Sequence, residues 1–150
     1  MWSAVSAAEP VVRLCHLKTW PDFAGYGFNL HADRATPGQY IGKVDDRSPA
    51  EAAGLCLHDR IVEVNGIAVD GKSHAEVVAN IKSIDGAVSL LVVDAASDAF
   101  YRNNGVAISS SLDDIHSIHC PDHNPHSPNA TGTVVCILYL VSCLSHGYSV

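Results

Sequence analysis

The sequence predicts an α+β fold in which about five to six antiparallel strands form a small, partly open barrel with two helices. Three observations lead to this prediction. Between residues 11 and 94, short apolar segments of strand length alternate with turn signals. Two helix-capping sequences interrupt these segments. Asn65-Gly66 stands between two of them and marks a hairpin, because both residues accept a positive φ.

The expected strands share apolar, β-branched composition and are bounded by Gly, Pro, Asn or Asp. The first alternates well enough for an edge strand, and the last is rich in β-branched residues. In order along the chain, the six segments are residues 12–17, 27–31, 39–44, 60–64, 67–69 and 87–93.

Two helices are expected between the strands. Ser48-Pro49-Ala50-Glu51 combines a capping serine, proline at the first helical position and a glutamate three residues after the cap. Gly54 then supplies a left-handed end, so this helix holds little more than one turn. Ser73-His74-Ala75-Glu76 is a second capping box, and it opens a helix that runs to about Ser83.

The character of the sequence changes after residue 94. We expect an N-terminal segment at 1–10, one domain at 11–94, a helical extension at 95–105 and a mostly disordered, low-order tail at 106–150. The tail contains an apolar stretch at 134–144. A bilayer span takes about 20 apolar residues, so no direct membrane insertion is expected.

Composition and motifs exclude several classes of function. The 150-residue chain has a formal net charge of -7 and no lysine/arginine stripe, so no nucleic acid partner is expected. No catalytic triad, carboxylate pair, phosphate-binding loop or dinucleotide fingerprint is present, so we expect no enzyme and no cofactor. The first ten residues lack the basic start and apolar stretch of a secretory signal.

The segment that carries function is Gly25-Tyr26-Gly27-Phe28, at the entry to the second expected strand. The two glycines allow successive N–H groups to turn toward one point, a nest suited to an anion. The aromatic residues place apolar surface beside that point. The helix at 73–83 presents His74, Val78 and Ile81 on one face. A carboxylate next to an apolar pocket is the chemistry of a protein's C-terminal residue.

Five blocks in the same order resemble a PDZ domain: Gly25 to Phe28, Gly38 to Ile41, Ser48 to Leu55, Asp59 to Gly66 and Leu90 to Asp94. Arg13-Leu14-Cys15, Trp20-Pro21 and the Ser-Pro-Ala-Glu-Ala-Ala-Gly run are similar to the sodium–hydrogen exchanger regulatory factor (NHERF) adaptors. Residues 59–98, with Gly71 to His74 and the Ser97 to Tyr101 extension, resemble their second PDZ domain. The resemblance covers about residues 11–102 and not the divergent tail.

The resemblance implies a scaffold or adaptor that binds C-terminal peptides ending Ser/Thr-x-hydrophobic by β-strand addition. The partners it implies are the tails of membrane transporters, channels and receptors, met in the cytoplasm at the inner face of the plasma membrane. It assigns the peptide carboxylate to the N–H groups of Tyr26, Gly27 and Phe28, and the Ser/Thr hydroxyl to His74. The pocket for the last side chain would consist of Tyr26, Phe28, Leu30, Val78 and Ile81, and upstream peptide residues would meet Asn29, His31 and Gly42.

At one position the sequence departs from the family. Where the family often has arginine after the Tyr-Ile of the third strand, this chain has Gly42, followed by Lys43. An arginine there would favour an acidic residue upstream in the ligand. Strand alternation turns Lys43 to the other face, so we expect weaker acidic selection.

Three alternatives remain open from the sequence. A single PDZ domain could act as a competitor that occupies partner tails without bridging them. The end Tyr148-Ser149-Val150 resembles a PDZ ligand, which could make the chain an autoinhibited or self-associating binder. In the tail, zinc could meet a cluster of possible ligands: His116, His119, Cys120, His123 and His126.

Overall fold

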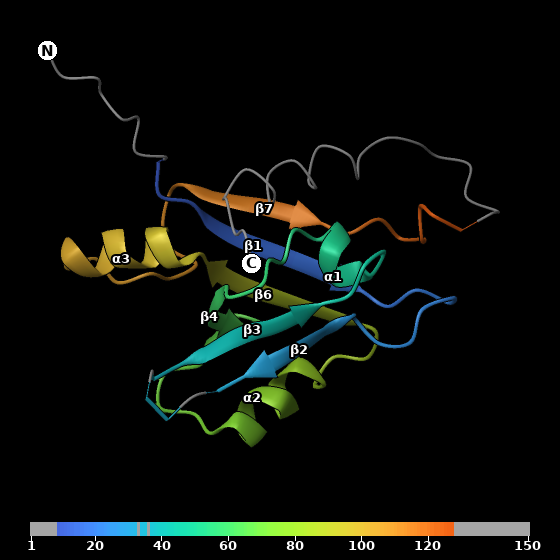
Figure 1. Ribbon diagram of the computed structural model, residues 1–150, viewed down its shortest axis with the longest axis horizontal. Coiled ribbons are helices and arrows are strands. Elements are labelled where there is room, and N and C mark those ends of the chain that lie inside the picture. Colours follow the sequence, from blue (N-terminus) through green and yellow to red (C-terminus); the bar gives the residue numbers. More distant parts are fainter. Residues whose placement is uncertain (1–8, 33, 36, 128–150) are drawn as a thin grey trace, which may run out of the picture.

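The computed structural model describes residues 9–32, 34, 35 and 37–127. Seven strands and three helices lie in this part of the chain (Figure 1). The strands are β1 (Val12–Lys18), β2 (Phe28–His31), β3 (Gln39–Val44), β4 (Arg60–Val64), β5 (Ile67–Ala68), β6 (Ala87–Val93) and β7 (Ile115–His119). The helices are α1 (Pro49–Ala52), α2 (His74–Ile81) and α3 (Ala95–Asn103).

The strands form one curved sheet in the order β2-β3-β4-β6-β1-β7, with β5 paired to β4. The predicted α+β fold with a partly open barrel is confirmed, and the first six strands lie within a residue or two of their expected positions. The sheet differs in being mixed, because β1 and β7 run parallel while the other pairs are antiparallel.

Capping side chains begin the helices as the sequence predicts. The Ser48 side chain accepts from the N–H of Glu51 at the start of α1, and Gly54 follows with a φ of +82°. At α2 both halves of the Ser73/Glu76 capping box are formed. These bonds satisfy N–H groups that the first helical turn leaves without a partner, and so they fix the residue at which α2 begins.

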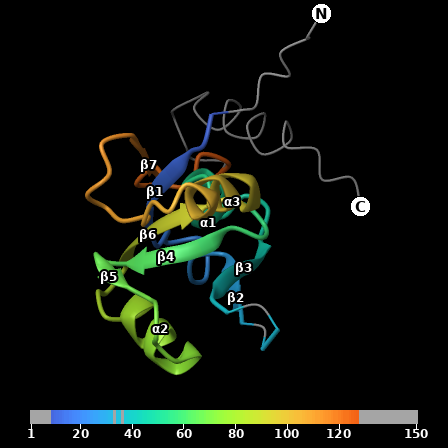
Figure 2. The ribbon, with the colours of Figure 1, turned by 90° about the vertical axis from the view of Figure 1, so that its left-hand side faces the viewer.

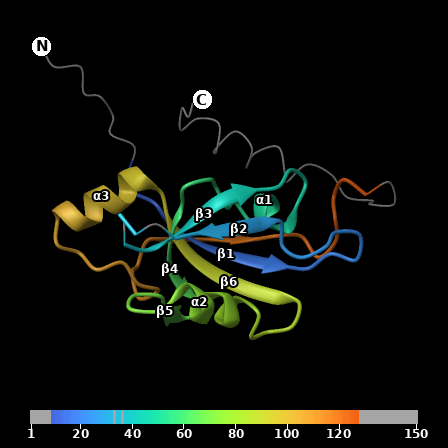
Figure 3. The ribbon, with the colours of Figure 1, turned by 60° about the horizontal axis from the view of Figure 1, so that its bottom comes forward.

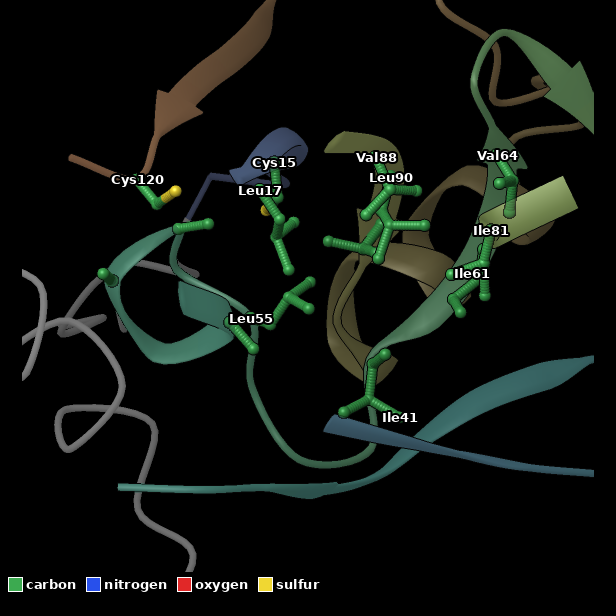
Figure 4. Close-up of a cluster of buried hydrophobic side chains, with 14 of the residues drawn as sticks. Cys15, Leu17, Ile41, Leu55, Ile61, Val64, Ile81, Val88, Leu90 and Cys120 are labelled. Carbon is green, nitrogen blue, oxygen red and sulfur yellow. The ribbon is translucent and has the colours of Figure 1, made fainter. Parts of the chain in front are cut away.

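The main core lies inside the curve of the sheet (Figure 4). Leu17, Ile41 and Leu90 are at most 1% exposed there, and Leu55 approaches them from the segment after α1. Val77 and Ile81 of α2 belong to the same cluster, which holds this helix against the barrel. Burial of each such side chain stabilises the fold by roughly 1.5–3 kcal/mol before entropy is counted.

A second, smaller core covers the other side of the sheet. Its buried members, Val12, Val62, Leu91 and Val93, pack against partly buried residues from α3 and the following segment. Those outer residues include Tyr101, Ile108, Leu112 and Ile115. The prediction of a low-order tail that begins at residue 106 therefore needs correction for residues 106–127. Apolar side chains spaced along a polar segment close this second core.

The prediction that β1 lies at the edge of the sheet is wrong, because β7 pairs with it on that side. The parallel pairing runs from Val12 opposite Ile115 to His16 opposite His119. Beyond β7, the Trp20 Nε1–H donates to the Pro121 carbonyl at 2.8 Å, and the Cys120 N–H donates to the His16 carbonyl at 2.9 Å. These bonds keep the segment on the sheet, so β1 becomes an interior strand.

None of the helices in residues 9–127, the two masked positions 33 and 36 aside, is long and apolar enough to cross a membrane. The apolar stretch predicted at 134–144 lies outside the described residues.

A buried ion pair joins β1 to the turn before β4. The Arg13 guanidinium contacts the Asp59 carboxylate and also donates to the Gly54 carbonyl. Asp59 is 1% exposed, and its burial raises the pKa of its carboxyl above the ordinary value even beside this guanidinium. Removing one member of such a pair is costly, because the other charge is left buried without compensation.

We therefore expect Arg13→Met to lower the free energy of unfolding by about 3–5 kcal/mol, measured by urea denaturation. Methionine retains an apolar stem and removes only the charged group. Lys18→Met is the matched control, because Lys18 and Asp122 form an ion pair that is exposed on both sides. Its effect should be much smaller. Equal losses in the two variants would contradict this account of the buried pair.

Candidate functional site

One edge of β2 has no strand beside it in the described part of the chain, because β2 stands at the end of the sheet order. On its other side, Phe28 is opposite Val44, and the Asp45 N–H donates to the Gly27 carbonyl at 2.7 Å. In an antiparallel pair this pattern makes Phe28 and Val44 a non-hydrogen-bonded pair. The main-chain groups of Phe28 therefore point away from β3, and alternation directs those of Leu30 the same way.

The loop before β2 continues this open edge. Its carbonyls point into the domain: the Tyr26 carbonyl accepts from the Ala50 N–H at 2.9 Å, and the Gly27 carbonyl accepts from Asp45. No acceptor among the described residues meets the N–H of Tyr26 or Gly27. Figure 3 shows α1 beside the start of β2, where it anchors this loop. Two free N–H groups therefore precede that of Phe28 at the open edge.

Gly27 is required at its position for two reasons. Its φ is +83°, which side chains of L-residues rarely adopt. A Cβ atom built there would lie 2.2 Å from the Ser48 Cβ and 2.6 Å from the Ser48 Oγ. The same serine caps α1, so the loop and the helix are packed directly together. Gly25 also has a positive φ, of +74°, but nothing lies within 4 Å of its Cβ position.

Apolar side chains form a surface next to these N–H groups. Tyr26, Phe28 and Leu30 are half-buried and pack against the main core, which includes Ile81 of α2. Val78 is half-buried on the same helix, whereas Val77 is fully buried. Figures 1 and 2 show α2 beyond the open edge of β2. Four of the predicted pocket residues thus belong to the main core or pack against it, and Val78 lies on the same helix as Ile81.

The Tyr26 ring adds no charge to this surface. Partial burial raises the pKa of its phenol above the ordinary value, so the group is neutral near pH 7. Its ring centroid lies 6.4 Å from that of Phe28, in a tilted arrangement. An anion held at the neighbouring N–H groups would therefore meet no phenolate.

His74 is the first residue of α2 and is exposed. Its Nδ1 lies 3.0 Å from the Oε1 of Gln39, a nearly buried residue at the start of β3. The sequence predictions singled out His74 and missed Gln39. No local pattern connects two residues that lie 35 positions apart, so nothing in the sequence distinguished Gln39 from an ordinary strand residue.

The three residues predicted to face the upstream part of a ligand also meet. Asn29 and His31 are exposed on β2, and the ladder skips Gly42 between Lys43 and Ile41 of β3. A Cβ atom at Gly42 would lie 2.7 Å from the Asn29 Oδ1 and 3.1 Å from the His31 Cβ. Any larger residue at this bulge would therefore displace the Asn29 side chain and press against His31.

The geometry of the described residues does not support the zinc site considered from the sequence. Among the described residues, which include all five candidate ligands in the tail, no group of three or more His, Cys, Asp or Glu lies close enough to hold a metal ion.

Comparison with known proteins finds similar sequences and one matching domain family. Residues 22–93 match the PDZ domain family. The chain is 53% identical over 90 residues to the Na(+)/H(+) exchange regulatory cofactor NHE-RF2 of Oryctolagus cuniculus. It is 52% identical over 99 residues to the cofactor NHE-RF1 of Gallus gallus. It is 38% identical over 106 residues to the cofactor-like protein nrfl-1 of Caenorhabditis elegans.

These alignments cover 60%, 66% and 71% of the chain but 28%, 29% and 22% of the relatives. The chain therefore spans less than a third of the length of the curated relatives it matches. Among solved structures, the Dlg1 PDZ2 domain of the choanoflagellate Monosiga brevicollis aligns with a TM-score of 0.49 at 22% identity, covering 55% of this chain and 97% of that one.

The loop geometry gives a prediction about the two glycines. Gly25→Ala should lower the free energy of unfolding by about 1–2 kcal/mol, the cost of a left-handed backbone for a residue with a Cβ. Gly27→Ala should cost clearly more, because the same backbone cost is joined by the clash with Ser48. Urea denaturation of both variants measures the difference. Similar losses would mean that the loop and α1 are not packed as described.

Proposed function

We propose that this chain, which carries a PDZ domain of the Na(+)/H(+) exchange regulatory cofactor family, is a non-catalytic adaptor that captures the free C-terminus of partner proteins. The observation that carries the proposal is the open edge of β2, where the Phe28 N–H points outward and those of Tyr26 and Gly27 have no acceptor in the described residues. Such an edge is the template for adding an extended peptide as one more strand.

The peptide would lie between β2 and α2. The N–H groups of Tyr26, Gly27 and Phe28 would donate to its terminal carboxylate, and charge-assisted bonds of this kind are stronger than neutral ones. The last side chain would enter the apolar surface beside them, which favours leucine, valine, isoleucine or methionine. The pocket would consist of Tyr26, Phe28, Leu30, Val78 and Ile81.

His74 would recognise the residue two places before the end of the peptide. Its position at the start of α2 and its exposure leave the ring accessible from the groove. A serine or threonine hydroxyl there would form a hydrogen bond with the imidazole. The preferred ligand would then end in Ser/Thr-x-hydrophobic, while Asn29, His31 and Gly42 would meet residues further upstream.

The partners would be the C-terminal tails of membrane transporters, channels and receptors. This assignment rests on the relatives, which are named as regulatory cofactors of Na(+)/H(+) exchange. The chain would meet such tails in the cytoplasm, peripherally at the inner face of the plasma membrane. The groove offers only a short stretch of strand and a small pocket, so the affinity should be on the order of micromolar.

The first test is a fluorescence-anisotropy titration with a labelled peptide ending Asp-Ser-x-Leu. Binding should be on the order of micromolar, should be lost with the C-terminal amide, and should weaken about 3- to 10-fold in His74→Ala through loss of one hydrogen bond. The amide control isolates the carboxylate, because it leaves every side chain of the peptide unchanged.

A chain ending at residue 127 retains every described element and is the matched control for the tail. Binding by this shorter chain alone would identify autoinhibition by residues 128–150. Binding by neither chain, or equal binding of acid and amide, would overturn the proposed function.

Gly42 gives a second test. Gly42→Arg should increase the preference for a peptide with an acidic residue upstream, because the arginine would displace the Asn29 side chain and add a guanidinium next to the exposed residues of β2. Gly42→Met controls for side-chain size without charge. The ratio of affinities for an acidic and a neutral upstream peptide is the measurement. The same ratio in the parent chain and both variants would contradict this role for Gly42.

A further inference from the structure

We propose that Gln39 is a specificity-determining residue, which fixes the proton of the His74 ring on Nδ1 and thereby makes the groove select a hydroxyl. The inference rests on the proposed function and extends it to a residue that lies outside the pocket and needs no contact with the peptide. It concerns the chemical state of His74 rather than its position.

The geometry consists of one short contact between two elements. The Oε1 of Gln39 lies 3.0 Å from the Nδ1 of His74. Gln39 is 7% exposed, and its backbone is paired with Ile61 in the sheet, so its side chain starts from a rigid position. The capping box of Ser73 and Glu76 fixes where α2 begins, and buried Val77 and Ile81 hold this helix, with His74 as its first residue, against the barrel.

The chemistry follows from what each atom can do. An amide oxygen can only accept a hydrogen bond, so the contact requires Nδ1 to carry a proton. In a neutral imidazole, Nε2 is then left with a lone pair and acts as an acceptor. A serine or threonine hydroxyl can donate to that lone pair. A side chain without a donor, such as valine, gains nothing from it.

The opposite tautomer would favour a ligand that accepts a hydrogen bond over one that donates it. With the proton on Nε2, the ring would donate a hydrogen bond, and a ligand carboxylate would accept it more strongly than a neutral hydroxyl does. The choice between these two preferences therefore depends on the residue facing Nδ1. Among the described residues, Gln39 is the one with a hydrogen bond to the ring of His74.

Nuclear magnetic resonance of the unliganded full chain tests the ring directly. Long-range nitrogen–proton correlations distinguish the two tautomers, and the signals of His74 are those missing from His74→Ala. The unaltered chain should carry its proton on Nδ1, and Gln39→Met should shift the population toward Nε2. A proton on Nε2 in the unaltered chain, with the Gln39 amide turned to donate, would overturn the proposal.

A double-mutant cycle tests the consequence for binding. The chains are the parent, Gln39→Met, His74→Ala and the double variant, each titrated with peptides ending Ser-x-Leu and Val-x-Leu. Gln39→Met should weaken the serine peptide about 3- to 10-fold and leave the valine peptide unchanged. In the His74→Ala background the same substitution should have no effect on either peptide.

Asn104→Leu is the control for the loss of one amide hydrogen bond elsewhere, since Asn104 donates to the Phe100 carbonyl at the end of α3. This helix is well separated from α2 in Figures 1 and 2. The variant should leave the ratio of the two peptides as it is in the parent chain.

Gln39→Glu provides a gain of function. A carboxylate facing Nδ1 favours the doubly protonated ring, in which Nε2 donates. The variant should therefore bind a peptide with aspartate two places before the end better, relative to serine, than the parent chain does.

The outcomes separate the two proposals. If Gln39→Met weakens both peptides equally, or weakens the serine peptide as much without His74, then Gln39 only supports the fold and the inference is wrong. If neither the parent chain nor the chain ending at residue 127 binds either peptide while the ring carries its proton on Nδ1, the proposed function fails and the claim about selectivity fails with it. A preserved serine preference in Gln39→Met also overturns the inference.

Discussion

An unpaired strand edge tends to pair with whatever extended chain comes near, so a domain that keeps one must control what can reach it. In this protein the open edge of β2 is bordered by α2, whose buried residues Val77 and Ile81 hold the helix in the main core. A helix next to the edge limits the approach of another sheet, and under the function proposed above the edge would take one extended peptide. The rest of the structure serves to hold these two elements at their separation.

The loop that precedes β2 depends on α1 in the same way. Its carbonyls are occupied by Ala50 and Asp45, and Gly27 packs against the serine that caps α1. Because the carbonyls are satisfied from inside the domain, the N–H groups are left at the open edge. Contacts inside the domain therefore hold the loop in this one conformation, which is the preorganisation that the proposed function needs.

Contacts continue from α1 to the opposite edge of the sheet. Arg13 of β1 donates to the Gly54 carbonyl after α1 and pairs with buried Asp59. Ile118 of β7 approaches Gly54, where a Cβ atom would lie 2.9 Å from its Cδ1. Residues 106–127 thus include members of the packed domain, and α3 with the second core covers the side of the sheet opposite the main core.

By itself the sequence determined the elements with local signals: the two capped helices, the Asn65-Gly66 turn, the six alternating strands and the glycine-rich entry to β2. Each of these follows from backbone preferences that act within a few residues. Only the tertiary structure decided the parallel pairing of β7 with β1. Ile115 and Ile118 are an odd number of positions apart, so they face opposite sides of the strand and give no alternating pattern. It alone decided the contact between Gln39 and His74 as well, because residues 35 positions apart meet only when the packing of α2 against the sheet is fixed.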